Sequence, residues 1–258
     1  MKDLSTRFIS GLIGLVLLIV VVIKGGNVLA LSILLISLIG IREFYKALHN
    51  INIMPLQSIG YLGTILLFLS AIYPVITLDL VITCLIITLL VLIVSKKNID
   101  LGEVSLTVFG VLYIPFLLFH IYYLDKTDYI WLVFIIAFGT DTFAYVVGNL
   151  FGRHKLSPNL SPKKTVEGSV GGILGSMFLT TIYSIYIGNN ISWHLILLSI
   201  VVSVMSQLGD LAASKIKRMA GIKDYGFIMP GHGGVLDRFD SIIICAPLVY
   251  YYVYYFIN

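Results

Sequence analysis

Apolar runs of membrane-spanning length recur along the whole 258-residue chain. A helix needs about 20 predominantly apolar residues to cross the hydrocarbon core of a bilayer. Runs such as FISGLIGLVLLIVVVI and YIWLVFIIAFG lie far apart in the sequence, so they do not form one anchor on a soluble domain. Only 12% of the residues are charged, against about 25% in soluble domains. The sequence therefore predicts a polytopic membrane protein and excludes a soluble enzyme, a secreted disulfide-linked domain and a disordered chain.

The apolar runs divide into nine candidate transmembrane helices, and because they are continuously apolar the predicted fold class is all-α. The candidates cover residues 5–23, 27–47, 57–73, 76–95, 104–124, 129–148, 169–187, 191–213 and 241–257. When alternate loops are assigned to opposite sides, all 17 Lys and Arg residues except Lys24 and Lys126 fall on one side. Basic residues collect in cytoplasmic loops. We therefore expect a cytoplasmic N-terminus, an extracytoplasmic C-terminus and a location in the cell membrane.

The polar chemistry is concentrated in the second half of the chain. We expect a single transmembrane unit, 1–258, in which residues 1–128 are scaffold helices and residues 129–258 carry the activity. The connections on the outer side are short, whereas two inner loops, 149–168 and 214–240, are long and basic. The active site is therefore expected on the cytoplasmic face. The net charge of +4 follows from these loops and gives no reason to expect a nucleic-acid partner.

Two aspartates lie where a bilayer makes a charge expensive, near the inner ends of the sixth and eighth candidate helices: Asp141 and Asp210. On the eighth helix, residues at helical spacing form one polar stripe that cannot face lipid. The stripe consists of Ser203, Gln207, Asp210, Ser214 and Lys217. The alternative is a structural seam in which the aspartates only hold helices together. Asp79, near the outer end of the fourth helix, has no polar neighbours in sequence and is interpreted as an interfacial residue.

The segment from Ser214 to Asp240, here called the signature segment, combines lysines, arginines, a PGHGG turn and aspartates. Glycines allow backbone N–H groups to approach a phosphate, and basic side chains neutralise its charge. Carboxylates are the hard oxygen ligands that Mg²⁺ prefers. The combination indicates nucleotide chemistry. The loop 149–168 has a similar basic composition, for which attraction to anionic lipids is an equally good explanation.

The signature segment resembles the motif of the phosphatidate cytidylyltransferases, also called CDP-diacylglycerol synthases. The matching positions are Ser214, Ile216, Lys217, Arg218, Lys223, Asp224, Gly226, Pro230, His232, Gly233, Gly234, Val235, Asp237, Arg238, Phe239 and Asp240. Met229 departs from the usual residue, but it is an apolar residue of similar volume. A second region of the family is similar to residues 141–168, where Asn149 replaces the usual basic residue. In the first half of the chain only REFY, with Glu43 as a weak site candidate, adds to the resemblance.

The resemblance implies that phosphatidic acid and CTP are the substrates and that CDP-diacylglycerol and pyrophosphate are the products, with Mg²⁺ as cofactor. The resemblance leaves open whether one cation or two are bound. Metal ions and basic side chains would allow two polyanions to approach each other.

The residue roles expected from the resemblance fall into three groups. Asp210 and Asp237 are the expected metal ligands, with Asp141 and Asp240 as further or alternate ligands. The expected catalytic residues are Asp210, Asp237, Asp240 and Lys217. The expected substrate-binding residues are Lys163, Lys164, Ser214, Arg218, Lys223, His232, Gly233, Gly234 and Arg238. Lys163 and Lys164 would cover the nucleotide or the lipid headgroup, and His232 either donates to the leaving pyrophosphate or only shapes the turn.

Two other functions compete with this interpretation. A CTP-dependent polyprenol kinase would release CDP instead of pyrophosphate. A cation-coupled transporter would bind its ion at Asp141 and Asp210, but transporter sites lie near the bilayer midplane, often in paired repeats, and no repeat is visible here. The expected partners are the two substrates and the lipid bilayer. The sequence leaves open whether the chain also forms a homodimer.

Overall fold

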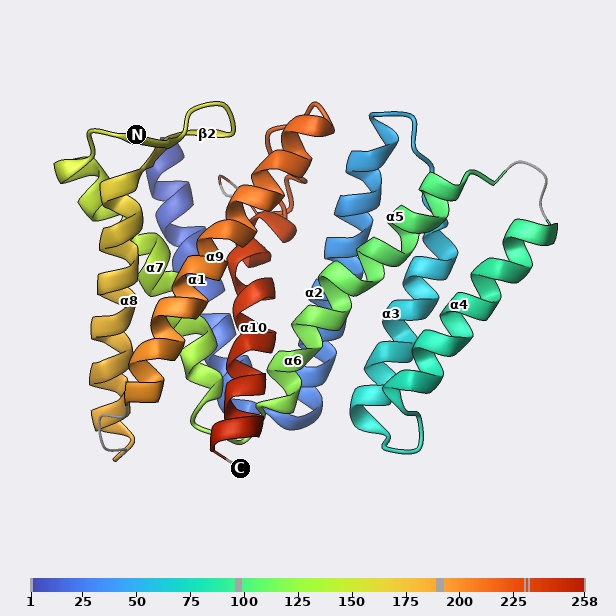
Figure 1. The fold of residues 1–258 in the computed structure, drawn as a ribbon, viewed down its shortest axis with the longest axis horizontal. Helices are drawn as coiled ribbons and strands as arrows, with labels where there is room; N and C mark the ends of the chain where they lie inside the picture. Colours follow the sequence, from blue (N-terminus) through green and yellow to red (C-terminus); the bar gives the residue numbers. More distant parts are fainter. Residues whose placement is uncertain (1, 96–98, 189–192, 230, 232, 258) are drawn as a thin grey trace. The chain divides into compact units, whose positions relative to one another are not determined.

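The computed structural model describes residues 2–95, 99–188, 193–229, 231 and 233–257, with side chains from residue 9 onward. Helices make up nearly all of the regular structure of these residues (Figure 1). The elements are α1 (Lys2–Lys24), α2 (Gly26–His49), α3 (Gln57–Ile72), α4 (Leu78–Ser95), α5 (Leu101–Val111), the π-helix η1 (Leu112–Phe116), α6 (Leu117–Tyr123), α7 (Ile130–Phe151), β1 (Lys155–Ser157), β2 (Ser161–Thr165), α8 (Val166–Tyr186), α9 (Trp193–Met219) and α10 (Leu236–Phe256).

The predicted polytopic all-α fold is confirmed. Within the described residues, seven helical segments are long and apolar enough to cross a membrane, and two shorter apolar helices, Ile9–Lys24 and Gln57–Ile72, accompany them. The fifth candidate is one continuous segment, Leu101–Tyr123, in which α5 passes through η1 into α6. Pro115 lies inside η1, and because proline has no N–H to donate, a local π-helical turn is a common way to accommodate it.

Several boundaries differ from those expected. Helix α9 continues to Met219 and α10 begins at Leu236, so the loop between them is shorter than the expected 214–240. The residues at these helix ends are charged, and charged residues at a membrane surface can remain helical although their hydropathy suggests a loop. The loop 149–168 contains an antiparallel hairpin of β1 and β2, with Lys155 opposite Thr165 and Ser157 opposite Ser161.

The chain forms two compact units. The first contains Met1–Asp125 and Met219–Arg238, and the second contains Lys126–Arg218 and Phe239–Asn258. The long segment of the first unit ends at Asp125, close to residue 128, where the scaffold region was expected to end. The middle of the signature segment also belongs to the first unit.

Helix α2 is the centre of the first unit, where it packs against α3, α5, η1 and α6. Tyr45 is fully buried, and its hydroxyl donates a hydrogen bond of 2.8 Å to the carbonyl oxygen of Thr107 on α5. Gly60 and Gly110 lie directly against the Tyr45 ring, where a Cβ atom would overlap it. These close approaches hold α3 and α5 against α2.

Helices α7 and α8 form the tightest pair of the second unit and lie side by side in Figure 1. Glycines on α8 allow this approach, because a Cβ atom at Gly172 would overlap the carbonyl oxygen of Thr140 and one at Gly175 would overlap Phe143. Helix α9 joins the pair through a hydrogen bond of 2.8 Å from the Thr140 hydroxyl to Ser203 Oγ. The β1–β2 hairpin lies across the end of α8 where that helix begins (Figure 1).

Candidate active site

Three helices of the second unit each contribute a carboxylate to one place. Asp240, at the start of α10, interacts electrostatically with Asp210 on α9 and with Asp141 on α7. The Asp141 carboxylate also accepts a hydrogen bond of 3.3 Å from the hydroxyl of Ser241. Asp240 itself accepts the backbone N–H of Ser241 at 2.8 Å. We call Asp141, Asp210 and Asp240 the aspartate cluster.

Two lysines counter the negative charge of the aspartate cluster. The Lys164 ammonium forms an ion pair with Asp210, and the Ser214 hydroxyl lies 3.5 Å from the other oxygen of that carboxylate. Lys217 attracts Asp240, and both side chains are only 8% exposed. Charged groups at such depth need close partners of opposite sign. Two basic groups therefore accompany the three carboxylates; Asp240 and Lys217 are buried, Asp210 and Lys164 are half-buried, and Asp141 is exposed.

The polar stripe expected on the eighth helix faces inward, as predicted. Ser203, Gln207 and Lys217 are buried in α9. The Gln207 side-chain amide donates a hydrogen bond of 3.3 Å to the carbonyl oxygen of Ser169 on α8. Because the same face also carries Asp210, the stripe both joins α9 to its neighbours and presents the carboxylate to them.

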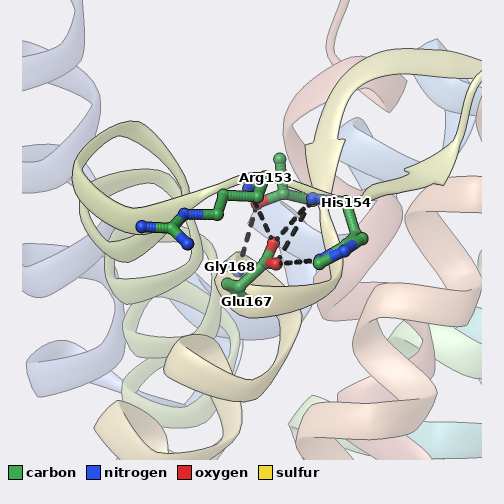
Figure 2. Close-up of polar contacts among 5 residues, drawn as sticks. Arg153, His154, Glu167 and Gly168 are labelled. Carbon is green, nitrogen blue, oxygen red and sulfur yellow. Dashed lines mark hydrogen bonds and ion pairs between the residues drawn. The ribbon is translucent and has the colours of Figure 1, made fainter.

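The hairpin that carries Lys164 is fixed to the start of α8 by Glu167, as Figure 2 shows. The Glu167 carboxylate accepts the backbone N–H groups of Arg153 at 3.1 Å and His154 at 3.2 Å. It also lies 2.6 Å from the His154 ring Nδ1. Thr165 caps α8, because its hydroxyl accepts the N–H of Gly168 at 3.1 Å. Lys164 thus occupies a fixed position in a loop that is otherwise exposed.

Asp237 organises the signature segment within the first unit. One oxygen of its carboxylate accepts the N–H of Tyr225 at 2.8 Å and the N–H of Gly234 at 2.9 Å. Gly233 has φ +88°, a conformation that residues with a Cβ atom rarely adopt, and it lies against the same carboxylate. Asp237 therefore links the two sides of the turn that precedes α10.

Glu43 joins the signature segment to α2. Its two carboxylate oxygens accept the backbone N–H groups of Val235 at 3.1 Å and Leu236 at 2.8 Å, where α10 begins. The first N–H groups of a helix lack partners within that helix, and a carboxylate is their strongest side-chain acceptor. Glu43 is only 5% exposed. Gly226 and Gly234 lie so close to it that a Cβ atom at either position would overlap its carboxylate.

The structure brings some of the predicted site residues together and separates others. The second unit unites Asp141, Asp210, Asp240, Lys164, Lys217 and Ser214, and it also contains the exposed residues Lys163 and Arg218. The first unit contains Lys223, Gly233, Gly234, Asp237 and Arg238. Since Asp210 and Asp237 belong to different units, their pairing as metal ligands stays a prediction. His232 lies outside the described residues.

The aspartate cluster has the right donor chemistry for Mg²⁺. Carboxylate oxygens are hard ligands, and Mg²⁺ in nucleotide sites uses one or two of them together with phosphate oxygens and waters. Among the described residues, no three His, Cys, Asp or Glu side chains are arranged to hold a metal ion by themselves. The residues therefore fit an ion whose other ligands come from a bound phosphate.

Sequence reasoning underestimated Glu43 and did not single out its neighbours. A carboxylate inside the apolar run of α2 is the same signal that identified Asp141 and Asp210. Arg42 and Lys46 were counted only among the basic residues that indicate the orientation in the membrane. Their i, i+4 spacing, however, places them on one face of a helix. Glu167, which lies within the second region of the resemblance, anchors the hairpin.

The chain is similar to known proteins along nearly its whole length. The model of the cytidylyltransferase family matches residues 5–256. A protein of Staphylococcus epidermidis named phosphatidate cytidylyltransferase is 36% identical over 257 residues, which is 95% of this chain and 97% of the relative. Proteins of the same name from Staphylococcus haemolyticus and Staphylococcus aureus are 34% identical with the same coverage. Because the family match and these similarities extend over nearly the whole chain, the protein belongs to the cytidylyltransferase family.

Proposed function

We propose that this protein is a phosphatidate cytidylyltransferase, which transfers CMP from CTP to phosphatidic acid and releases pyrophosphate. The observation that carries the proposal is the near full-length similarity to proteins of that name. The aspartate cluster with Lys164 and Lys217 supports it, because this set of charges suits phosphate chemistry.

In the proposed reaction, an oxygen of the lipid phosphate attacks the α-phosphorus of CTP. The bond from the α-phosphorus to the bridging oxygen of the β-phosphate breaks, and pyrophosphate leaves with that electron pair. A phosphate monoester has a second pKa near 6, so the nucleophile is largely deprotonated at neutral pH and needs no strong base. The main barrier is the repulsion between two polyanions. Lys164 and Lys217 would reduce that repulsion and hold the phosphates in line.

We propose Mg²⁺ as the cofactor, held by Asp210 with Asp141 or Asp240 and, as expected from the sequence, by Asp237. When bound, the ion would neutralise phosphate charge and orient the phosphoryl groups. Lys164 neutralises Asp210 and would also contact a phosphate bound beside that carboxylate. Removal of divalent ions should therefore abolish turnover, and added Mg²⁺ should restore it.

We further propose nine membrane crossings, with the N-terminus and the active site on the cytoplasmic side. The distribution of basic residues supports this orientation. It places the β1–β2 hairpin, the end of α9 and the start of α10 where CTP is available. The mass of the detergent-solubilised protein, measured by light scattering, would decide between a monomer and a homodimer.

The decisive experiment identifies both products. Purified protein is incubated with phosphatidic acid, a polyprenol, Mg²⁺ and CTP labelled at the α-phosphorus in one reaction and at the γ-phosphorus in another. We expect the α label in a CDP-lipid and the γ label in pyrophosphate. Release of the α label as CDP together with transfer of the γ label to a polyprenol would contradict the proposal and establish a lipid kinase.

A further inference from the structure

The first unit contains a cavity of about 510 Å³ between the last turns of α2 and the beginning of the signature-segment turn. Residues about 180 positions apart in the sequence form its two walls. One wall consists of Ile39, Arg42, Glu43, Lys46, Ala47 and Asn50, and the other consists of residues 222–228.

Three cations line this cavity. Arg42 and Lys46 are both exposed and lie one turn apart on the same face of α2, while Lys223 approaches from the opposite wall. The Glu43 carboxylate already accepts the N–H groups of Val235 and Leu236. Asp224 is the other acidic residue among the lining residues. The cavity therefore has an excess of positive charge suited to a compact dianion such as a phosphate monoester.

The polarity of the cavity changes along the helix. Ile39 lies one turn before Arg42, toward the apolar middle of α2, whereas Lys46 and Asn50 lie toward its end. The opposite wall adds Phe227, which is 88% exposed, and Ile228, which is 56% exposed. A membrane phospholipid has the same order of groups, with acyl chains toward the bilayer and the phosphate at its surface. A nucleotide has no long apolar portion to match Ile39, Phe227 and Ile228.

We propose that this cavity binds a phosphate monoester headgroup on a diacylglycerol, with Arg42 and Lys46 contacting the phosphate and the apolar residues contacting the glycerol and upper acyl chains. The inference rests on the proposed function, because it identifies where the lipid substrate is held. Arg42 supplies a planar, bidentate donor for phosphate oxygens, and Lys46 supplies a point charge. Glu43 lies against Gly226 of the opposite wall, and its hydrogen bonds fix the start of α10.

The kinetic test neutralises both cations of α2 in the full-length enzyme. In the double variant Arg42→Gln/Lys46→Gln, the KM for phosphatidic acid, varied as its mole fraction in mixed micelles, should rise at least tenfold, as expected for the loss of charge-assisted contacts. The KM for CTP should change less than twofold. The matched control Lys24→Gln/Lys126→Gln removes the same number of positive charges at positions that do not line the cavity. It should behave like the unmodified protein.

Two kinetic outcomes would overturn the inference. A rise in the KM for CTP with an unchanged KM for phosphatidic acid would assign the cavity to nucleotide phosphates. Unchanged KM values for both substrates would show that the cavity holds neither. If the double variant is not recovered as folded protein, the KM values are compared instead for the single variant Lys46→Gln and the charge-preserving variant Arg42→Lys. Lys46→Gln should raise the KM for phosphatidic acid, and Arg42→Lys should raise it less than Arg42→Gln.

A binding measurement without CTP separates this inference from the proposed function. Radiolabelled phosphatidic acid in detergent micelles is captured on immobilised protein, with excess inorganic phosphate or excess phosphatidylcholine as competitor. Capture should fall at least tenfold in the double variant and should resist both competitors. Strong competition by inorganic phosphate alone would identify a free-phosphate site instead of a lipid site. If the unmodified protein captures the lipid but forms no CDP-lipid, the proposed function fails while the cavity assignment stands. Equal capture by both proteins would reject the assignment whatever the turnover.

Discussion

Lys164 on the β1–β2 hairpin forms an ion pair with Asp210 on α9. A lysine of the basic loop 149–168 is therefore bound to the carboxylate that we expect to be a metal ligand. An ammonium group is a natural partner for the charge of a half-buried carboxylate. A bound ion would compete with Lys164 for Asp210 and release the ammonium toward phosphate oxygens. The ion pair therefore connects the loop 149–168 to the aspartate cluster.

Replacement of Asp210 should abolish most activity. Asp210→Asn preserves shape but removes a hard anionic ligand, so turnover should fall about a hundredfold or more. The measurement is the initial rate of CDP-lipid formation at several Mg²⁺ concentrations. Asp79→Asn, in the first turn of α4, is the control and should leave the rate close to normal. Near-normal turnover of Asp210→Asn at limiting Mg²⁺ would transfer the metal role to Asp141 or Asp240.

Asp210 and Asp237 are expected to bind the same metal ion, so the effects of replacing them should not be independent. Asp237→Asn should also reduce turnover by orders of magnitude, and the double variant should be little worse than the worse single variant. Rates for the two single variants and the double variant, measured at saturating CTP, test this. Fully multiplicative losses would show that the two carboxylates act independently and that Asp237 serves only the turn it organises.

Glu43 should matter for the stability of the folded protein. Glu43→Ala leaves the N–H groups of Val235 and Leu236 without their acceptors in a buried position, which costs about 1–3 kcal/mol for each group. Glu43→Gln retains one acceptor oxygen and should lose less. Thermal unfolding in detergent, monitored by circular dichroism, gives the order of stability. A Glu43→Ala protein as stable as Glu43→Gln would contradict the capping role.

The hairpin should loosen when Glu167 is replaced. Glu167→Ala removes the acceptor for Arg153 and His154, so the segment that positions Lys164 should become more accessible to protease. We expect faster cleavage by trypsin after Lys163 or Lys164 and a higher KM for at least one substrate. Glu167→Gln keeps one carbonyl oxygen as an acceptor, so its rate of cleavage should lie between those of the unmodified protein and Glu167→Ala. Unchanged cleavage kinetics in Glu167→Ala would show that the hairpin is held by its strand pairing alone.

The proposed orientation can be tested by cysteine labelling. After removal of Cys84 and Cys245, a cysteine in place of exposed Asn159, in the hairpin turn, should react with a membrane-impermeant thiol reagent only from the cytoplasmic side. A cysteine in place of Val75, which is 89% exposed between α3 and α4, should react only from outside. Labelling of both positions from the same side would overturn the alternation of the loops.

The helical architecture could be predicted because hydrocarbon tolerates few alternatives. A long apolar run inside a bilayer must satisfy its own backbone hydrogen bonds, so the apolar runs predict helices directly. The inward face of α9 was also predictable, since Ser203 and Asp210 fall on one side at helical spacing. Helix ends were less predictable. The charged residues near Met219 and Leu236 are helical, although their hydropathy suggested a loop.

The arrangement of the site was only partly predictable. Asp141 and Asp210 were functional candidates because of their place in apolar runs, and Asp240 because of the signature segment. Their grouping follows from the packing of three helices. The contact between Glu43 and Leu236 spans 193 residues, and no local pattern predicts such a pair. The same holds for the cavity, because its two walls meet only when the turn folds against α2.

The contacts of Glu43 with Gly226 and Gly234 impose a constraint on how this sequence can vary. The two glycines are required less by the turn that contains them than by a side chain on a distant helix, since a Cβ atom at either position would overlap that carboxylate. Substitutions at these positions are therefore coupled. An alanine at position 234 should be harmful on its own but tolerated better when position 43 is shortened to Asp, so the three positions are expected to evolve together and not one at a time.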